Sequence, residues 1–337
     1  MNPKDLKTYL RRLLKEELQL SVMMWGAPGI GKSSIVQQLS GEFDMGLKDV
    51  RLSQLAPSDL RGLPVPDQEE RLSRWYPPEF LPRSGAGILF LDELNMAPPT
   101  MQGIAQQLIL DREVGSYSVP EGWYIWAAGN RKEDRASVFE MPSPVANRFI
   151  HLQVEPEYEA FQSYALEAQL HEQVQAFLAF RPELLFSMNS DAPAWPSPRS
   201  WEMASYLHEA ELDVAAAVGE GAAGEFYTYL DVYADLPDLE RIINGDGDDI
   251  PFPAEVSVQY AATMGLSVRI STAQEAVASL QWMLNKASRE FTQLCLKNVL
   301  PKLQKEGAFG AFYQAVNGND GLKELREQAE DLIGQHM

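Results

Sequence analysis

Gly26-Ala27-Pro28-Gly29-Ile30-Gly31-Lys32-Ser33 is the stretch of sequence that decides the fold of this chain. It matches the phosphate-binding pattern G-x-x-x-x-G-K-[ST] at every constrained position. Residues 21–25 before it have the composition of a buried strand, and residues 34–39 after it have the composition of a helix start. A chance glycine-rich turn would not need a strand before it and a helix after it, so the context favours a phosphate-binding loop.

The chemistry of such a loop depends on its backbone and on two side chains. Glycines let backbone N–H groups curl around a phosphate, and the start of a helix adds partial positive charge. The ammonium group of Lys32 would reach the β- and γ-phosphates, and the Ser33 hydroxyl would hold Mg²⁺. The candidate nucleotide-binding residues are Gly26, Ala27, Pro28, Gly29, Ile30, Gly31, Lys32, Ser33 and Ser34.

Composition narrows the classes of partner. The chain has 337 residues and a formal net charge of −20, with 28 Lys and Arg against 48 Asp and Glu. Binding of nucleic acid or of an anionic membrane through a broad basic surface is therefore disfavoured. Nucleic acid could then bind only in a local basic pore within an oligomer. A protein partner with basic patches fits this charge better.

The compartment is predicted from cysteine usage and from the first residues. The single cysteine, Cys295, allows no intrachain disulfide and suits a reducing compartment. The first residues carry spaced basic side chains without an apolar core, so no signal peptide is expected. No run approaches the roughly 18 apolar residues of a membrane-spanning helix. These features predict a soluble cytoplasmic protein.

Buried strands alternate with helical segments in the first half of the chain. The clearest strands are residues 87–93, an apolar run that ends in two acids, and residues 123–130. Shorter candidates cover residues 50–52 and 149–154, and leucines on one face predict a helix over residues 3–18. This alternation predicts an α/β fold, a parallel sheet sandwiched by helices.

Helical patterns dominate after about residue 155. Residues 273–300 have the apolar periodicity of one long helix, which Pro301 would stop. Cys295 would pack inside it, and the histidines lack the spacing of metal ligands, so no zinc site is predicted. We predict three domains: an α/β nucleotide-binding domain over residues 1–157, a helical lid over residues 158–215, and a C-terminal helical extension of that lid over residues 216–337.

Two acids at a strand end would complete the nucleotide site. Phosphoryl transfer needs a metal and a positioned water as well as a phosphate cradle. Asp92 would hold Mg²⁺, directly or through water, and Glu93 would polarise the attacking water as general base. Alone, this pair would be interpreted as a charged strand end. The phosphate loop earlier in the chain favours the catalytic interpretation.

Three further polar residues are candidates for the same chemistry. Asn130, at the end of the next strand, would orient the water or would only cap that strand. Arg148 would reach the nucleotide of a neighbouring subunit as an arginine finger, or would pair with a surface acid. Arg131 and Arg135 are the alternative fingers. Arg199, at the predicted start of a helix in the second domain, would contact the γ-phosphate and report the nucleotide state.

The order of these motifs resembles that of AAA+ ATPases, in particular the MoxR-like branch grouped with the dynein- and midasin-related modules. The motifs stand in the family's order of Walker A, Walker B, sensor 1, arginine finger and sensor 2, as Gly26–Ser33, Asp92–Glu93, Asn130, Arg148 and Arg199. Residues 56–62 resemble the family's stretch after the second strand, and Asn95 is typical of its extended Walker B. The resemblance covers roughly residues 20–210 and thins over residues 215–337.

The resemblance implies a homo-oligomeric ring, usually hexameric, with ATP and Mg²⁺ at subunit interfaces and Arg148 acting in trans. It also implies two exposed insertions, residues 62–80 and residues 111–123. Trp75 and Tyr76 in the first insertion would grip a partner or pack in the core. Members of this family often work with a von Willebrand factor A domain protein that bridges to the target, which implies a protein substrate.

The sequence therefore predicts an Mg²⁺-dependent ATPase that remodels or matures a partner protein as a ring. Two alternatives stay open. A nucleic-acid translocase subunit is disfavoured by the negative charge, and a nucleotide-dependent binding switch with little turnover is disfavoured by Glu93 and Arg148. The choice of ATP over GTP follows from the resemblance, since the chain has no guanine-reading N-K-x-D motif.

Overall fold

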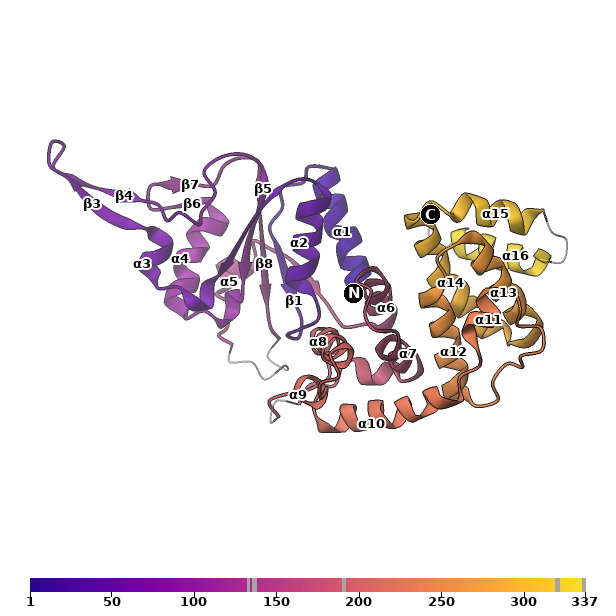
Figure 1. Cartoon of the computed structure of the whole chain (residues 1–337). Coiled ribbons are helices and arrows are strands. Elements are labelled where there is room, and N and C mark those ends of the chain that lie inside the picture. The colour runs from indigo at the N-terminus through magenta and orange to yellow at the C-terminus, as the bar shows by residue number, and fades with distance from the viewer. Residues whose placement is uncertain (132–133, 135–137, 190–191, 319–321, 335–337) are drawn as a thin grey trace. The chain divides into compact units, whose positions relative to one another are not determined.

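The computed structural model describes residues 1–131, 134, 138–189, 192–318 and 322–334. The chain divides into two compact units, Met1–Glu157 and Tyr158–Met337. The first unit is built from strands and helices, and the second from helices (Figure 1). The predicted division of the helical part at residue 215 stays a prediction.

A five-stranded parallel sheet forms the centre of the first unit. Its strands lie in the order β2-β5-β8-β1-β9, and every neighbouring pair is parallel. Nearly all residues of β5 and β8 are buried, as expected for central strands covered on both faces. The strands are β1 (Val22–Trp25), β2 (Gly46–Arg51), β5 (Gly87–Asp92), β8 (Trp123–Gly129) and β9 (Ile150–Gln153).

Helices pack on both faces of this sheet. In Figure 1, α1 and α2 lie on one face, and α3 and α4 lie on the other. The predicted sandwich of a parallel sheet between helices is therefore confirmed. The elements are α1 (Pro3–Lys15), α2 (Lys32–Glu42), α3 (Pro57–Arg61), α4 (Pro99–Leu110) and α5 (Ser143–Ala146), with 3₁₀ turns η1 (Leu52–Gln54) and η2 (Leu94–Met96).

The first helix is shorter than its leucine pattern predicts. The Asn2 side chain caps its start by accepting a backbone hydrogen bond. The helix ends at Lys15, and Glu17 then adopts a left-handed φ of 52°, which takes the chain out of the helical path. Leu18 is therefore exposed and does not belong to the buried leucine face.

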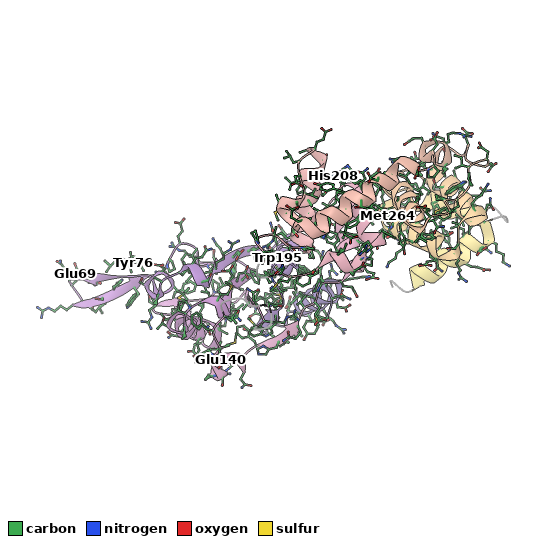
Figure 2. The ribbon with its side chains drawn as sticks, turned by 90° about the horizontal axis from the view of Figure 1, so that it is seen from below. Glu69, Tyr76, Glu140, Trp195, His208 and Met264 are labelled. Carbon is green, nitrogen blue, oxygen red and sulfur yellow. The ribbon has the colours of Figure 1, made fainter. Side chains whose placement is uncertain are left out.

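Two hairpins leave the sheet where insertions were predicted. β3 (Leu63–Asp67) and β4 (Leu72–Tyr76) form an antiparallel arm, with Glu69 at its tip and Tyr76 toward its base (Figures 1 and 2). β6 (Glu113–Val114) and β7 (Tyr117–Ser118) form a short hairpin whose Ser116 hydroxyl donates to the Trp75 carbonyl at 2.6 Å. Tyr76 is 60% exposed, so the predicted alternative that this residue packs in the core is wrong.

The second unit packs its helices around two apolar clusters. One contains Phe177, Trp201 and Phe226, whose ring centroids lie 5.4 to 6.0 Å apart. The other contains Leu280 and Leu296. The helices are α6 (Tyr158–Glu167), α7 (Glu172–Phe180), α8 (Pro198–Glu209), α9 (Ala215–Val218), α10 (Glu220–Leu230), α11 (Leu239–Ile243), α12 (Val256–Arg269), α13 (Ala273–Lys286), α14 (Arg289–Lys305), α15 (Phe309–Asn317) and α16 (Lys323–Gly334), with 3₁₀ turns η4 (Pro182–Leu185) and η5 (Asp231–Asp235). Among the helices that the structure describes, none has the length and apolar content that crossing a membrane requires.

The predicted single helix over residues 273–300 is two helices, α13 and α14. Ala287 between them is extended, with ψ 164°, and Ser288 is the N-cap of α14. The apolar periodicity runs across this break, so the pattern alone does not reveal it. Pro301 does not stop α14 either, because the helix continues beyond it and buries Leu303 on its next turn.

Cys295 packs inside α14, as predicted. It is fully buried, and the Ser267 hydroxyl donates to its sulfur at 3.5 Å. Burial raises the pKa of the Cys295 thiol to about 11. At neutral pH the side chain is therefore a neutral packing group.

Two histidines join α7 to α8. The rings of His171 and His208 have centroids 4.6 Å apart, and His208 Nε2 lies 2.5 Å from the side-chain oxygen of Gln173. Burial lowers the pKa of His208 below its ordinary value of 6.5, and His171 lowers it further. Because the folded state favours the neutral ring, the stability from this site is complete above pH 6.5 and is lost as pH falls through the folded-state pKa.

We therefore expect the second unit to unfold at lower urea concentration at about pH 5 than at about pH 7.5. In His208→Gln the titrating group is gone while a polar side chain is kept, so the difference between the two midpoints should shrink. Urea unfolding of the whole chain, followed by circular dichroism, measures both midpoints. The same difference in wild type and variant would contradict this assignment.

Candidate nucleotide-binding site

The phosphate loop joins β1 to α2, as the pattern predicts. Residues 26–31 lie between the end of the strand and the first residue of the helix. Gly31 directly precedes α2 with φ +96°, a backbone conformation that glycine adopts without strain. The first N–H groups of a helix have no acceptor within it, so those of α2 can donate to a bound phosphate.

Lys32 lies against the loop. It is the first residue of α2 and is only 8% exposed. Its Nζ atom donates to the carbonyl oxygens of Gly26 at 2.7 Å and of Ala27 at 2.9 Å. These contacts hold the ammonium group over the loop backbone, where it can neutralise a phosphate.

Oxygen atoms from α2 and β5 meet next to this lysine. Ser33 Oγ donates to Asp92 Oδ2 at 3.0 Å, and the other carboxylate oxygen accepts from the N–H of Glu93 at 2.9 Å. Burial raises the pKa of Asp49 on β2, and the charge of Asp92 raises it further. A hydroxyl and a carboxylate at this spacing are ligands that Mg²⁺ uses, and the negative field at this edge favours a cation.

Glu93 follows β5 with a left-handed backbone, φ 55° and ψ 33°. Its carboxylate accepts a hydrogen bond from the Ser53 hydroxyl. Ser53 lies in η1, directly after β2, and β2 neighbours β5 in the sheet. The sequence analysis missed Ser53, because a serine after a strand carries no signal until the order of the strands is known.

Asn95 fixes the end of β8. Its side-chain Nδ2 donates to the carbonyl of Asn130 at 2.7 Å, and its Oδ1 accepts from the backbone N–H of the same residue at 3.1 Å. Asn95 is 3% exposed. Gly129 makes this approach possible, because a Cβ there would lie 2.5 Å from Asn95 Oδ1. The Asn130 amide contacts Met96 Sδ at 3.1 Å, so both asparagines belong to one packed corner.

A cavity of about 710 Å³ opens beside this corner. It lies where β1, β8 and β9 end, and residues 139–141 close another side. The lining residues are Trp25, Asn95, Asn130, Arg131, Phe139, Glu140, Met141 and Gln153.

Residues 21–151 match the model of a family described as the ATPase family associated with various cellular activities (AAA). This segment is a MoxR-like AAA ATPase domain. It includes the phosphate loop, Asp92, Glu93, Asn130 and Arg148. The predicted family, the predicted AAA+ fold and the assignment as an ATPase are therefore confirmed.

The chain is also similar to solved structures at low sequence identity. The RuvB Holliday junction branch migration motor of Thermotoga maritima has 14% identity and a TM-score of 0.40, over 79% of this chain and 82% of that chain. NtrX from Brucella abortus in complex with ADP has 16% identity and a TM-score of 0.34, over 97% and 68%. A Cytophaga hutchinsonii protein assigned as an ATPase has 13% identity and a TM-score of 0.35, over 86% and 79%. At these TM-scores it is the family match that identifies the domain.

Arg148 of the AAA domain is exposed on the turn between α5 and β9. The next residue, Phe149, is buried in the core, which anchors the turn. Arg148 forms no ion pair with any residue that the structure describes, so pairing with a surface acid has no support there. Arg131 instead pairs with Asp134 at 3.2 Å. The other alternative finger, residue 135, lies outside the described residues.

Arg199 belongs to the second unit. A helix starts there as predicted: α8 begins one residue earlier, and Ser197 caps it by accepting a hydrogen bond from the N–H of Ser200. Arg199 is exposed. Its contact with nucleotide stays a prediction.

Proposed function

We propose that the chain is an Mg²⁺-dependent ATPase that assembles into a ring and uses its hydrolysis cycle to remodel or mature a partner protein. The observation that carries this proposal is the 3.0 Å contact between Ser33 and Asp92. It brings the end of the phosphate loop to the acid at the end of β5. Glu93 comes next in the chain, so a metal ligand and a general base stand at consecutive positions.

Binding of Mg-ATP would use the loop as predicted. Residues 26–34 would surround the phosphates, with Lys32 neutralising the β- and γ-phosphate charge. Ser33 and Asp92 would hold Mg²⁺, and their oxygen atoms fit the preference of this ion for hard ligands. When bound, Mg²⁺ neutralises charge on the phosphate oxygens.

Hydrolysis to ADP and phosphate would use four further residues. Glu93 would accept the proton of the water that attacks the γ-phosphate, and Asn130 would orient that water. Asn95 holds Asn130 in place through two hydrogen bonds. Arg148 of a neighbouring subunit would stabilise the charge on the transferred phosphoryl group. Arg199 would contact the γ-phosphate from the lid and signal its presence.

The arm, residues 63–76, supports a role in contacting a protein. Cross-strand partners share one face of a hairpin, and the face containing the pair Leu63 and Tyr76 also carries Val65 and Leu72. All four side chains are exposed. The same face carries the ion pair of Arg74 with Asp67 at 2.8 Å, so exposed apolar side chains and charges form this surface together. Exposed apolar side chains rimmed by polar ones are a feature of protein-contact surfaces. The partner would be a protein target, reached directly or through a von Willebrand factor A domain protein.

Mixed rings test the proposal. ATP turnover should fall about 10²- to 10⁴-fold in Glu93→Gln rings and about 10³- to 10⁵-fold in Arg148→Ala rings, because each lacks one half of every site. In a mixture, the Glu93 of one subunit meets the Arg148 of its neighbour, so turnover should partly return. Phosphate release and the mass of the assembly are measured together.

Arg83→Ala is the matched control, because Arg83 is another exposed arginine of the same unit. This variant should hydrolyse ATP at the wild-type rate. Intact mixed rings without any recovered turnover would contradict a finger in trans. Full turnover by a monomer would contradict the ring.

Ser53 gives a further expected result. Its hydroxyl holds the Glu93 carboxylate, so removing it should free that carboxylate for the attacking water. We expect Ser53→Ala to raise basal ATP turnover about tenfold or more, the effect of losing one hydrogen bond to a charged group. Ser53→Thr keeps the hydroxyl and should behave as wild type. A fall in turnover for Ser53→Ala would show that Ser53 instead orients Glu93 for hydrolysis.

A further inference from the structure

His151 on β9 contacts two segments on either side of it. Trp25 Nε1 donates to its Nδ1 atom at 2.8 Å, and its Nε2 atom lies 2.7 Å from the Ala146 carbonyl oxygen. The Trp25 and His151 ring planes are within 10° of parallel, with centroids 6.0 Å apart, which fits a hydrogen bond in the plane of both rings. One imidazole therefore bridges the end of β1 and the end of α5.

The two contacts fix the tautomer of this histidine. An indole N–H only donates and a backbone carbonyl only accepts, so Nδ1 must be unprotonated and Nε2 must carry the proton. The neutral imidazole is the one form that satisfies both partners. His151 is exposed, and it supplies an acceptor for Trp25 and a donor for Ala146 from one side chain.

One end of this bridge adjoins the phosphate loop, and the other adjoins the turn that carries Arg148. Trp25 is the last residue of β1 and directly precedes Gly26, the first residue of the phosphate loop. Ala146 is the last residue of α5, and its carbonyl also accepts the N–H of Phe149 at 3.2 Å, across the turn that carries Arg148. The imidazole thus ties the start of the loop to the base of the arginine turn.

His151 connects the start of the phosphate loop to the turn with Arg148 through its side chain. The pairing of β1 with β9 connects the same region of the chain through backbone hydrogen bonds. β9 pairs with β1, with His151 opposite Met23, so Trp25 lies two residues further along on the same face. The Phe149 ring packs edge-on against His151, with centroids 6.4 Å apart. A shift of the loop on nucleotide binding would therefore move this imidazole and, through it, the turn.

We propose that His151 is a positioning residue, which couples the phosphate loop of its own subunit to the Arg148 that this subunit presents to its neighbour. This inference rests on the proposed function, since it requires Arg148 to act in trans. Through the bridge, the nucleotide state of one site would set the finger of the next site.

Three variants separate the bridge from simple packing. His151→Leu removes both polar contacts, Trp25→Phe removes the donor, and His151→Gln can still accept with its oxygen and donate with its nitrogen. We expect His151→Leu to lower kcat about 10- to 100-fold, the usual effect of misplacing a catalytic group, with KM for ATP unchanged. Trp25→Phe should fall between this variant and wild type, and His151→Gln should recover most of the activity.

The site of the defect is located by mixing subunits. His151→Leu subunits keep Glu93, and Glu93→Gln subunits keep a correctly held Arg148, so mixed rings should regain turnover at their shared interfaces. No recovery here, in mixtures where Arg148→Ala subunits do recover, would overturn the role of His151 while leaving the trans finger intact. No recovery in either mixture would overturn the proposed function itself. A raised KM in His151→Leu, with kcat unchanged, would place the effect in its own phosphate loop and also overturn the inference.

Discussion

Lys32→Ala is expected to abolish nucleotide binding. The Lys32 ammonium group is buried against the loop carbonyls, and a bound phosphate would face it in a site with little water. Removing one partner of a buried charge pair costs about 2–5 kcal/mol, so the affinity for ATP should fall at least about 30-fold. Titration with a fluorescent ATP analogue measures this dissociation constant directly.

Lys7→Ala is the matched control for the lost charge. Lys7 donates to the Gln38 side chain on α2 at 2.8 Å, so it touches the same helix away from the loop. This variant should bind nucleotide as wild type does. Wild-type affinity in Lys32→Ala would show that residues 26–33 are not the phosphate cradle.

Glu93→Gln should separate binding from hydrolysis. The substitution keeps the shape of the side chain and removes its ability to accept a proton, so turnover should fall about 10²- to 10⁴-fold. ATP affinity should be preserved, because Lys32, Ser33 and Asp92 are untouched. ATP should then stay bound and hold the subunits together, which mass measurement of the ATP-loaded protein would detect.

Glu16→Gln serves as the control for this change, since Glu16 is exposed after α1 and outside the site. It should hydrolyse ATP at the wild-type rate. If Glu93→Gln kept its turnover, Glu93 would not be the base. If wild type and Glu93→Gln hydrolysed ATP equally slowly in the absence of a partner, the enzyme would need an activator, or the chain would act as a switch.

The parts of the site that the sequence predicts are those where chemistry restricts the residue type. A phosphate loop requires glycines and a lysine in fixed order, and a Walker B strand requires acids after an apolar run. Asn130 and Arg148 are predicted from the ends of strands and from motif order, and their roles stay predictions. The structure adds the contacts of Lys32 with Gly26 and Ala27, which no pattern contains.

Ser53 and His151 show what the sequence does not reveal. Each contacts a residue that is distant in the chain, and each is placed by the order of the strands, β2 beside β5 and β1 beside β9. The break at Ala287 was missed for a different reason: its apolar neighbours continue the helical period, while the backbone conformation changes at a single residue. The prediction that Pro301 ends the helix was wrong, because tertiary packing stabilises the helix beyond the proline.

The burial of Cys295 has a practical consequence for measuring conformational changes of this protein with fluorescent labels. With a pKa of about 11 and no exposed sulfur, the native thiol has almost no reactive form at neutral pH. Maleimide dyes should therefore not react with Cys295. A cysteine introduced at Glu69 on the arm or at Arg83 would be labelled selectively. Distance changes between such dyes could be followed during turnover in a chain whose own cysteine never had to be removed.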